Sequence, residues 1–138
     1  MSTPILRAEF VLAHEKLDPD ILRAELELQP SKAHARGDPI PGPLGTARLG
    51  LWQVHTHRRT TADIEEVLLE LLTMIDGHES ELARVRRQYE LKAGFSVDAR
   101  VNTDQPFLHL TASTISRLAA FDASLDIDVN PMDSPMSD

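Results

Sequence analysis

The stretch Tyr89-Glu-Leu-Lys-Ala-Gly-Phe-Ser-Val-Asp-Ala-Arg-Val-Asn102 decides the fold of this chain. Apolar residues alternate in it with polar residues and one glycine, and side chains two residues apart point to the same face of a strand. We therefore expect one face of this strand to pack on a core while the other meets water, which is typical of an antiparallel sheet. The stretch predicts a sheet that helices cover on one face only.

Helices are expected at four places around this sheet, of which the short one at residues 79–87 adds to the clearest helix and is not counted separately in the order of elements. The clearest covers residues 61–76, because apolar residues recur there at helical spacing from Ile64 to Ile75. Its expected N-cap is Thr60 or Thr61, and Gly77 is its expected end. Three shorter helices are predicted from an Asp18-Pro19-Asp20 start with Pro30 as its stop, from residues 79–87, and from a cap at Thr111 or Ser113.

Shorter apolar runs predict the remaining strands. They cover residues 5–12, 50–54, 107–110 and 125–129, and the run at 107–110 follows the long strand closely enough to be its hairpin partner. The order β-α-β-α-β-β-α-β predicts an α+β fold, with a mainly antiparallel sheet of about five strands and helices packed on one face. We expect a single domain over residues 1–130 and a disordered acidic tail over residues 131–138.

The composition excludes several classes of protein. The chain has 138 residues, no cysteine and a formal net charge of −8. Without cysteine it has no disulfide framework, thiolate metal site or cysteine nucleophile, and no apolar run approaches the roughly 20 residues that a membrane helix needs. The negative charge opposes nucleic-acid binding, which depends on neutralising phosphates. We therefore expect a cytoplasmic protein that binds neither nucleic acid nor membrane.

The stretch from Ala33 to Trp52 predicts a long loop, since it is rich in glycine and proline and ends on the only tryptophan. Its surroundings are basic in an acidic chain. The candidate residues for binding a ligand or partner are Arg36, Arg48, Trp52, Arg58 and Arg59. They would line a shallow anionic-ligand pocket with the indole ring as its wall. In the alternative that we favour, Trp52 fills the core, and the arginines equally well balance the acidic surface.

A metal site is suggested only by His55-Thr56-His57, whose two imidazoles would project from the same face of a strand. A third ligand would have to come from His34, His78 or Asp38. The charges of Arg58 and Arg59 oppose a cation there, and two histidines alone lack the ligand set of a zinc site. We therefore expect no metal and no cofactor, and His55 and His57 are weak candidates as ligands.

Two segments carry a resemblance to a known family: Leu28-Gln29-Pro30-Ser31-Lys32-Ala33-His34-Ala35-Arg36-Gly37-Asp38 and Gly50-Leu51-Trp52. With them, the chain resembles almost end to end an uncharacterised bacterial family called domain of unknown function 4279. The likeness extends to the leucine-rich helix and to the closing strand, helix and strand, and it implies the same order of elements. Family members often carry a histidine early in the long helix, where this chain has Glu66 or a neighbouring residue, and an aromatic residue near the end, where this chain has Asn130.

No catalytic constellation accompanies these features, so we expect a protein that is not an enzyme. The first hypothesis is a non-catalytic binding or protein-interaction module of an immunity-type or regulatory kind. One alternative is a protein that binds a small anion or nucleotide with the basic loop, and another is a metal-assisted hydrolase using His55 and His57. The expected partner is a protein or a small anionic ligand, and pairing of sheet edges would give a homodimer.

Overall fold

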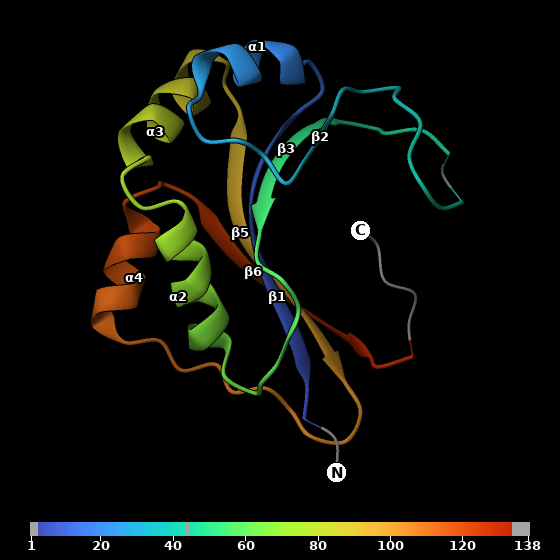
Figure 1. The fold of residues 1–138 in the computed structure, drawn as a ribbon, viewed down its shortest axis with the longest axis vertical. Coiled ribbons are helices and arrows are strands. Elements are labelled where there is room, and N and C mark those ends of the chain that lie inside the picture. Colours follow the sequence, from blue (N-terminus) through green and yellow to red (C-terminus); the bar gives the residue numbers. More distant parts are fainter. Residues whose placement is uncertain (1–2, 44, 134–138) are drawn as a thin grey trace.

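In the computed structural model, which describes residues 3–43 and 45–133, the chain folds into a mixed sheet with helices on one of its faces (Figure 1). The strands follow the order β2-β3-β1-β5-β6, and the short β4 pairs with the beginning of β1. Their bounds are β1 (Ile5–His14), β2 (Lys32–His34), β3 (Gly50–His55), β4 (Arg59–Thr60), β5 (Lys92–Val101) and β6 (Ser124–Pro131). The predicted α+β fold is confirmed.

All strand pairs are antiparallel except β5 and β6, which run parallel. The predicted hairpin partner at residues 107–110 is wrong. Phe107 is 65% exposed and forms only an isolated bridge with Asp63, because its N–H donates to the carbonyl of Ala62 at 2.6 Å. Strand β5 already has β1 on one side and β6 on the other, so no edge of it remains for a hairpin.

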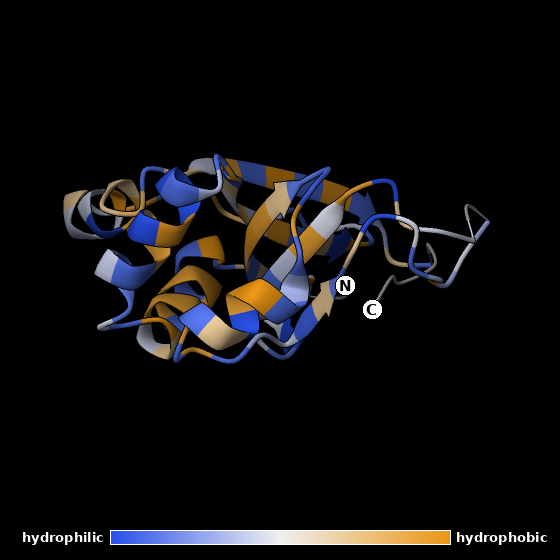
Figure 2. Cartoon of the chain, turned by 90° about the horizontal axis from the view of Figure 1, so that it is seen from above, coloured by the Kyte–Doolittle hydropathy of each residue, from blue (hydrophilic) through white to orange (hydrophobic). Residues whose placement is uncertain are grey.

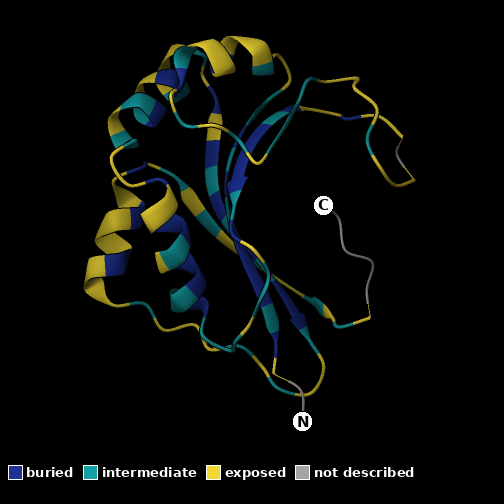
Figure 3. Cartoon of the chain, viewed as in Figure 1, coloured by how far each residue is buried: buried dark blue, intermediate teal, exposed yellow. Residues whose placement is uncertain are grey.

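The core lies between the sheet and the helices, where Figures 2 and 3 show apolar and buried residues gathered. The rings of Phe10, Phe95 and Phe121 meet at centroid distances of 5.1 to 5.6 Å. Trp52 is 0% exposed and lies opposite Leu12 in the register of β3 and β1. The prediction that Trp52 fills the core is confirmed.

The helices lie on the same side of the sheet (Figure 1). They are α1 (Pro19–Glu25), α2 (Ile64–Met74), α3 (Glu79–Gln88) and α4 (Ala112–Ala119). Asp18 caps α1 and Thr111 caps α4, as predicted. The predicted cap of α2 is wrong by at least two residues: Asp63 accepts the Glu65 N–H, while Arg59–Thr60 is occupied as β4.

The glycine- and proline-rich stretch is a loop for most of its length, and its first residues form the short edge strand β2. After the loop, Gly50 must be a glycine because an added Cβ would lie 2.4 Å from the carbonyl oxygen of Leu17. Of the expected tail at residues 131–138, Pro131 belongs to β6 and the N–H of Met132 donates to the carbonyl of Val101 at 2.8 Å, while residues 134–138 lie outside the described residues. Among the helices of the described segments, none is long and apolar enough to cross a membrane.

Candidate functional site

The face of the sheet turned away from the helices carries the candidate site. Because side chains alternate along a strand, the residues between the core-facing positions point to this side. We call it the open face, and it consists of Lys32 of β2, Gln53 and His55 of β3, Arg7, Glu9, Val11 and Ala13 of β1, Arg58 of the β3–β4 connection, Lys92, Gly94, Ser96, Asp98 and Arg100 of β5, and Ser124, Asp126, Asp128 and Asn130 of β6.

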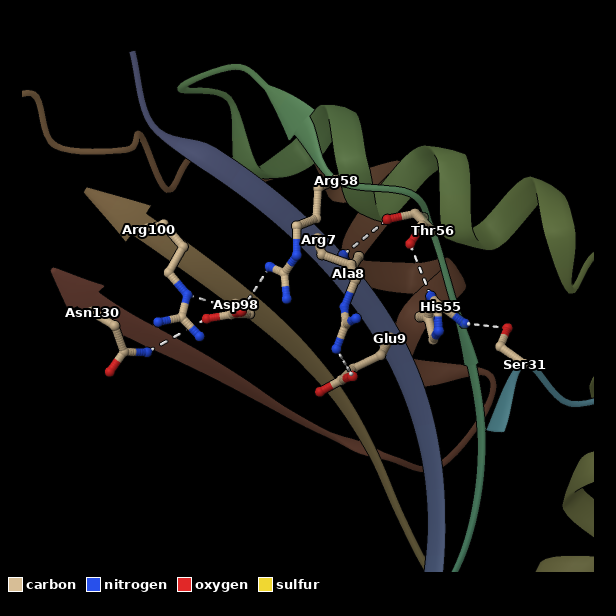
Figure 4. Close-up of polar contacts among 10 residues, drawn as sticks. All are labelled: Arg7, Ala8, Glu9, Ser31, His55, Thr56, Arg58, Asp98, Arg100 and Asn130. Atoms are coloured by element: carbon tan, nitrogen blue, oxygen red, sulfur yellow. Dashed lines mark hydrogen bonds and ion pairs between the residues drawn. The ribbon is translucent and has the colours of Figure 1, made fainter. Parts of the chain in front are cut away.

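Asp98 is the centre of a network of hydrogen bonds on the open face (Figure 4). Its Oδ2 accepts from Nη1 of Arg58 at 3.0 Å and from Nε of Arg100 at 3.3 Å. Its Oδ1 accepts from the side-chain amide of Asn130 at 3.4 Å. One carboxylate thus orients two guanidinium groups and joins β5 to β6 and to the β3–β4 connection, which pre-positions charge on an uncovered surface.

These charged groups are largely withdrawn from water although no helix covers them. The exposed fraction of the side chain is 9% for Arg7, 6% for Arg100 and 16% for Asp98. The other polar and charged side chains of the open face surround them. Charge–charge interactions are stronger in such surroundings than in bulk water, so the network holds its geometry.

Glu9 is the second carboxylate of this face, and its Oε2 lies 3.5 Å from Nη2 of Arg7. Burial raises the pKa of the Glu9 carboxyl above its usual value. The positive charge of Arg7 and the nearby His55 offset this only in part, while the negative charge of Asp98 adds to it. The charged form of Glu9 is therefore less favourable in the folded protein than it would be in water.

Backbone contacts around Thr56 fix the place from which Arg58 reaches the network (Figure 4). The side chain of Thr56 is buried and accepts the N–H of Ala8 at 3.1 Å. The backbone N–H of His55 donates to Oγ of Ser31 at 3.1 Å, and Nδ1 of His55 lies 3.0 Å from the Thr56 carbonyl oxygen. The chain therefore leaves β3 in a defined direction, which carries Arg58 over β1 toward Asp98.

Two hollows lie side by side on the open face. One, of about 300 Å³, is polar and is lined by side chains that include Arg7, Asp98, Arg100 and Asp128. The other, of about 250 Å³, has a mainly apolar lining that includes Val11, Ala13 and Gly94. Volumes near 300 Å³ are at the lower end of those found for ligand sites, and they suit single side chains of a partner as well as small molecules.

The residues of the predicted basic pocket are not brought together. Arg36 forms an exposed ion pair with Glu15 at 3.5 Å, and Arg48 is exposed in the loop. Arg59 binds Glu66 of α2 on the helix side of the sheet. Trp52 lies in the core and offers no wall to a surface pocket. Of the five predicted residues, Arg58 alone reaches the open face.

The two histidines of the metal hypothesis lie at the end of β3. His55 ends the strand, and His57 is exposed in the connection that follows. Of the proposed third ligands, His34 lies in β2 and His78 binds Glu81. Within residues 3–43 and 45–133 no three His, Asp or Glu side chains are grouped so that they could hold a metal ion.

The sequence interpretation missed Arg7, Glu9, Asp98 and Arg100. Their signal was present, since all four occupy the polar positions of alternating strands. From the sequence, we interpret the polar positions of residues 89–102 as a water-facing surface, which is the usual outcome, and residues 5–12 only as an apolar run. The contact with Arg58, forty positions away from Asp98, depends on the register of three strands and is not visible in the spacing of residues.

A comparison with family models matches residues 4–132 to the family described as domain of unknown function (DUF4279). No curated protein and no solved structure matches the chain.

Proposed function

The chain belongs to the family domain of unknown function (DUF4279), and we propose that it is a non-catalytic interaction module that binds a protein partner through the open face of its sheet. The family supplies no activity, so the proposal rests on geometry. One observation carries it: the network around Asp98 holds charged side chains in fixed positions on a face that the helices leave uncovered. A rigid scaffold that presents ordered polar groups is typical of a recognition surface.

The balance of charge on the open face favours a protein over a polyanion. Five basic side chains stand against four carboxylates there: Lys32, Arg7, Arg58, Lys92 and Arg100 against Glu9, Asp98, Asp126 and Asp128. Nucleic acid and other polyanions bind through a clear excess of positive charge. A mosaic of both signs instead selects a partner by complementary placement of charges and disfavours mismatched ones.

The order of the side chains supports the same function. The side chains of Arg7 and Arg100 are mostly buried before any partner arrives, so little conformational entropy is left for them to lose on binding. We place this interaction in the bacterial cytoplasm, which fits a chain without cysteine. An immunity-type or regulatory role is the form of this interaction that we propose.

The test is capture of the partner from the native host by the tagged chain and two matched variants. Ser96→Arg places a bulky cation in the middle of the open face, next to Glu9 in the register. Ser116→Arg makes the same substitution on the exposed side of α4. A cooperative thermal unfolding transition is required of each variant, as the check that it is folded.

We expect the wild-type chain and Ser116→Arg to retain a stoichiometric protein, and Ser96→Arg to lose it. Hydrogen exchange of the complex should show added protection in β1 and β5. Failure to recover a stoichiometric partner would refute the proposal, as would retention of the partner by Ser96→Arg. A second copy of the chain as the captured partner would identify the interaction as a homodimer through the same face.

A further inference from the structure

The apolar hollow of the open face is a trough with a defined shape. Its floor is formed where Val11, Gly94 and Ser124 lie directly opposite one another across β1, β5 and β6. Ala13 extends the floor toward the end of β1. These side chains are small or absent, so the neighbouring longer side chains stand above them and enclose about 250 Å³.

Gly94 keeps the trough open. Its backbone does not adopt a positive φ, so the conformation of the chain does not require glycine at this position. A Cβ added there would lie 3.1 Å from Oγ of Ser124 and would occupy the floor. The consequence of this glycine is therefore space on the surface, which a partner can use.

The two ends of the trough carry opposite charge. Glu9, Ser96 and Asp126 lie opposite one another in the register. The hydroxyl of Ser96 therefore has one carboxylate on each side, that of Glu9 and that of Asp126. Lys92 lines the other end, beside Ala13. An aliphatic chain with a cationic end would lie in only one direction here, with its cation toward the carboxylates and away from Lys92.

We propose that the trough binds a lysine or arginine side chain of the protein partner, with its aliphatic stem on Val11, Ala13 and Gly94 and its cationic group between Glu9 and Asp126. This inference rests on the proposed function and names the chemistry that the open face recognises. Long basic side chains bury their stems on apolar surface while the charged end keeps polar partners, and the trough offers both environments.

Other occupants fit less well. An anionic side chain would find a single cation, Lys92, at one end of the trough and would be repelled by two carboxylates at the other. An uncharged aliphatic chain would cover the floor and remove water from Glu9 without providing a compensating charge. Burial already raises the pKa of the Glu9 carboxyl, and a cation beside it would relieve that cost.

The experiment uses the isotope-labelled full chain and two small probes followed by nuclear magnetic resonance. The first is lysine blocked as N-acetyl and N-methylamide, and the second is norleucine blocked in the same way, which has a similar stem and no charge. We expect saturable amide shifts at Gly94 and Ser96 with the lysine probe at millimolar concentration, and weaker or no binding of the norleucine probe.

Three variants locate the site. Asp126→Asn should weaken binding of the blocked lysine about fivefold, whereas Asp76→Asn, the same change at an exposed position after α2, should leave it within about twofold. Gly94→Ala should weaken binding at unchanged charge by filling the floor. Equal effects of the two asparagine variants would show general attraction to an acidic surface and would overturn the proposal.

The probe needs no partner, so the two proposals can fail separately. If the blocked lysine does not bind but Ser96→Arg abolishes capture of a partner, the basic side chain is wrong and the proposed function stands. If the blocked lysine binds as expected and no partner is captured, the proposed function is overturned, and only the specificity of the trough for a basic side chain stands.

Discussion

Nη1 of Arg58 lies 3.0 Å from Oδ2 of Asp98, and this contact joins the connection after β3 to the middle of β5. The same oxygen accepts from Arg100, so two cations share one carboxylate atom. Removing that carboxylate would bring two positive charges together without the anion that separates them. Asp98 is therefore the residue on which the geometry of the open face depends.

Asp98→Asn should lower the free energy of unfolding by about 1–3 kcal/mol, because two largely buried cations lose the negative charge that they share. Urea unfolding at neutral pH measures this change. Asp128→Asn is the matched control, since Asp128 is exposed on the neighbouring strand, and its effect should stay within about 0.5 kcal/mol. Equal stability of the two variants would show that the Asp98 network contributes nothing to folding.

Glu9→Gln should gain stability relative to the wild type as pH rises. In the folded protein, burial raises the pKa of the Glu9 carboxyl above its usual 4.5. The contribution of Glu9 to the stability of the wild type is therefore complete below about pH 4.5, where Glu9 is protonated in both states. This contribution is lost as pH rises through the pKa of the folded state. Glutamine carries no charge and escapes that loss.

Urea unfolding of both proteins at pH 4 and pH 7 tests this prediction. Asp128→Asn serves as the control for removing a negative charge from the open face. If the wild type becomes more stable than Glu9→Gln on going from pH 4 to pH 7, then the ion pair with Arg7 outweighs burial and the prediction is wrong.

Trp52→Ala should lower the free energy of unfolding by about 3–5 kcal/mol, since the largest side chain of the core is removed. Trp52→Phe should cost much less. The buried indole Nε1 has no hydrogen-bond partner in the part of the chain that the structure describes, and phenylalanine has no such N–H to satisfy. As Trp52 is the only tryptophan, its fluorescence in the native protein should resist quenching by acrylamide. Efficient quenching would place the indole in solvent and contradict its burial in the core.

Glu90→Gly should raise the free energy of unfolding by about 1 kcal/mol. Glu90 follows α3 with a φ of 55°, a left-handed conformation that is unfavourable for residues with a Cβ. The N–H of Leu91 donates to the carbonyl of Arg86 at 2.8 Å, which is the bond that closes a helix at such a residue. Thermal or urea unfolding measures the gain.

Gly77→Ala provides the opposite case after α2. Gly77 has a φ of 84°, so alanine should lower the free energy of unfolding by about 1 kcal/mol. A loss of stability in both variants would show that Glu90 makes a contribution through its side chain that outweighs the backbone strain.

Local patterns predicted most of the fold because they depend on residues close in the chain. The alternation through β5, the apolar face of α2 and the Asp18 cap of α1 all appear where the sequence indicates them. The failures concern competition between distant segments. Phe107 belongs to an apolar run that is typical of a strand, but β6 occupies the edge that it would need.

The candidate site was less accessible to sequence analysis than the fold. Arg58 was singled out for its charge, yet its neighbours were sought in the loop before it and not in β5. Arg36 and Arg48 carry the same charge as Arg58, but they lie in the loop and do not reach the network around Asp98. Sequence shows which residues bear charge, whereas strand register decides which of them meet.

Because β6 is the last strand in the chain, the open face is completed only when β6 has been synthesised. Strand β6 follows every other strand in chain order, and it brings Asp126 and Asn130 to a face that β1, β3 and β5 have already begun to form. A nascent chain on the ribosome therefore presents Arg7, Arg58 and Arg100 together with Glu9 before Asp126, the second carboxylate of the trough, is added. Selectivity for a basic side chain would then arise only after β6 has emerged, so a chain stalled before residue 124 would carry the arginines without the site.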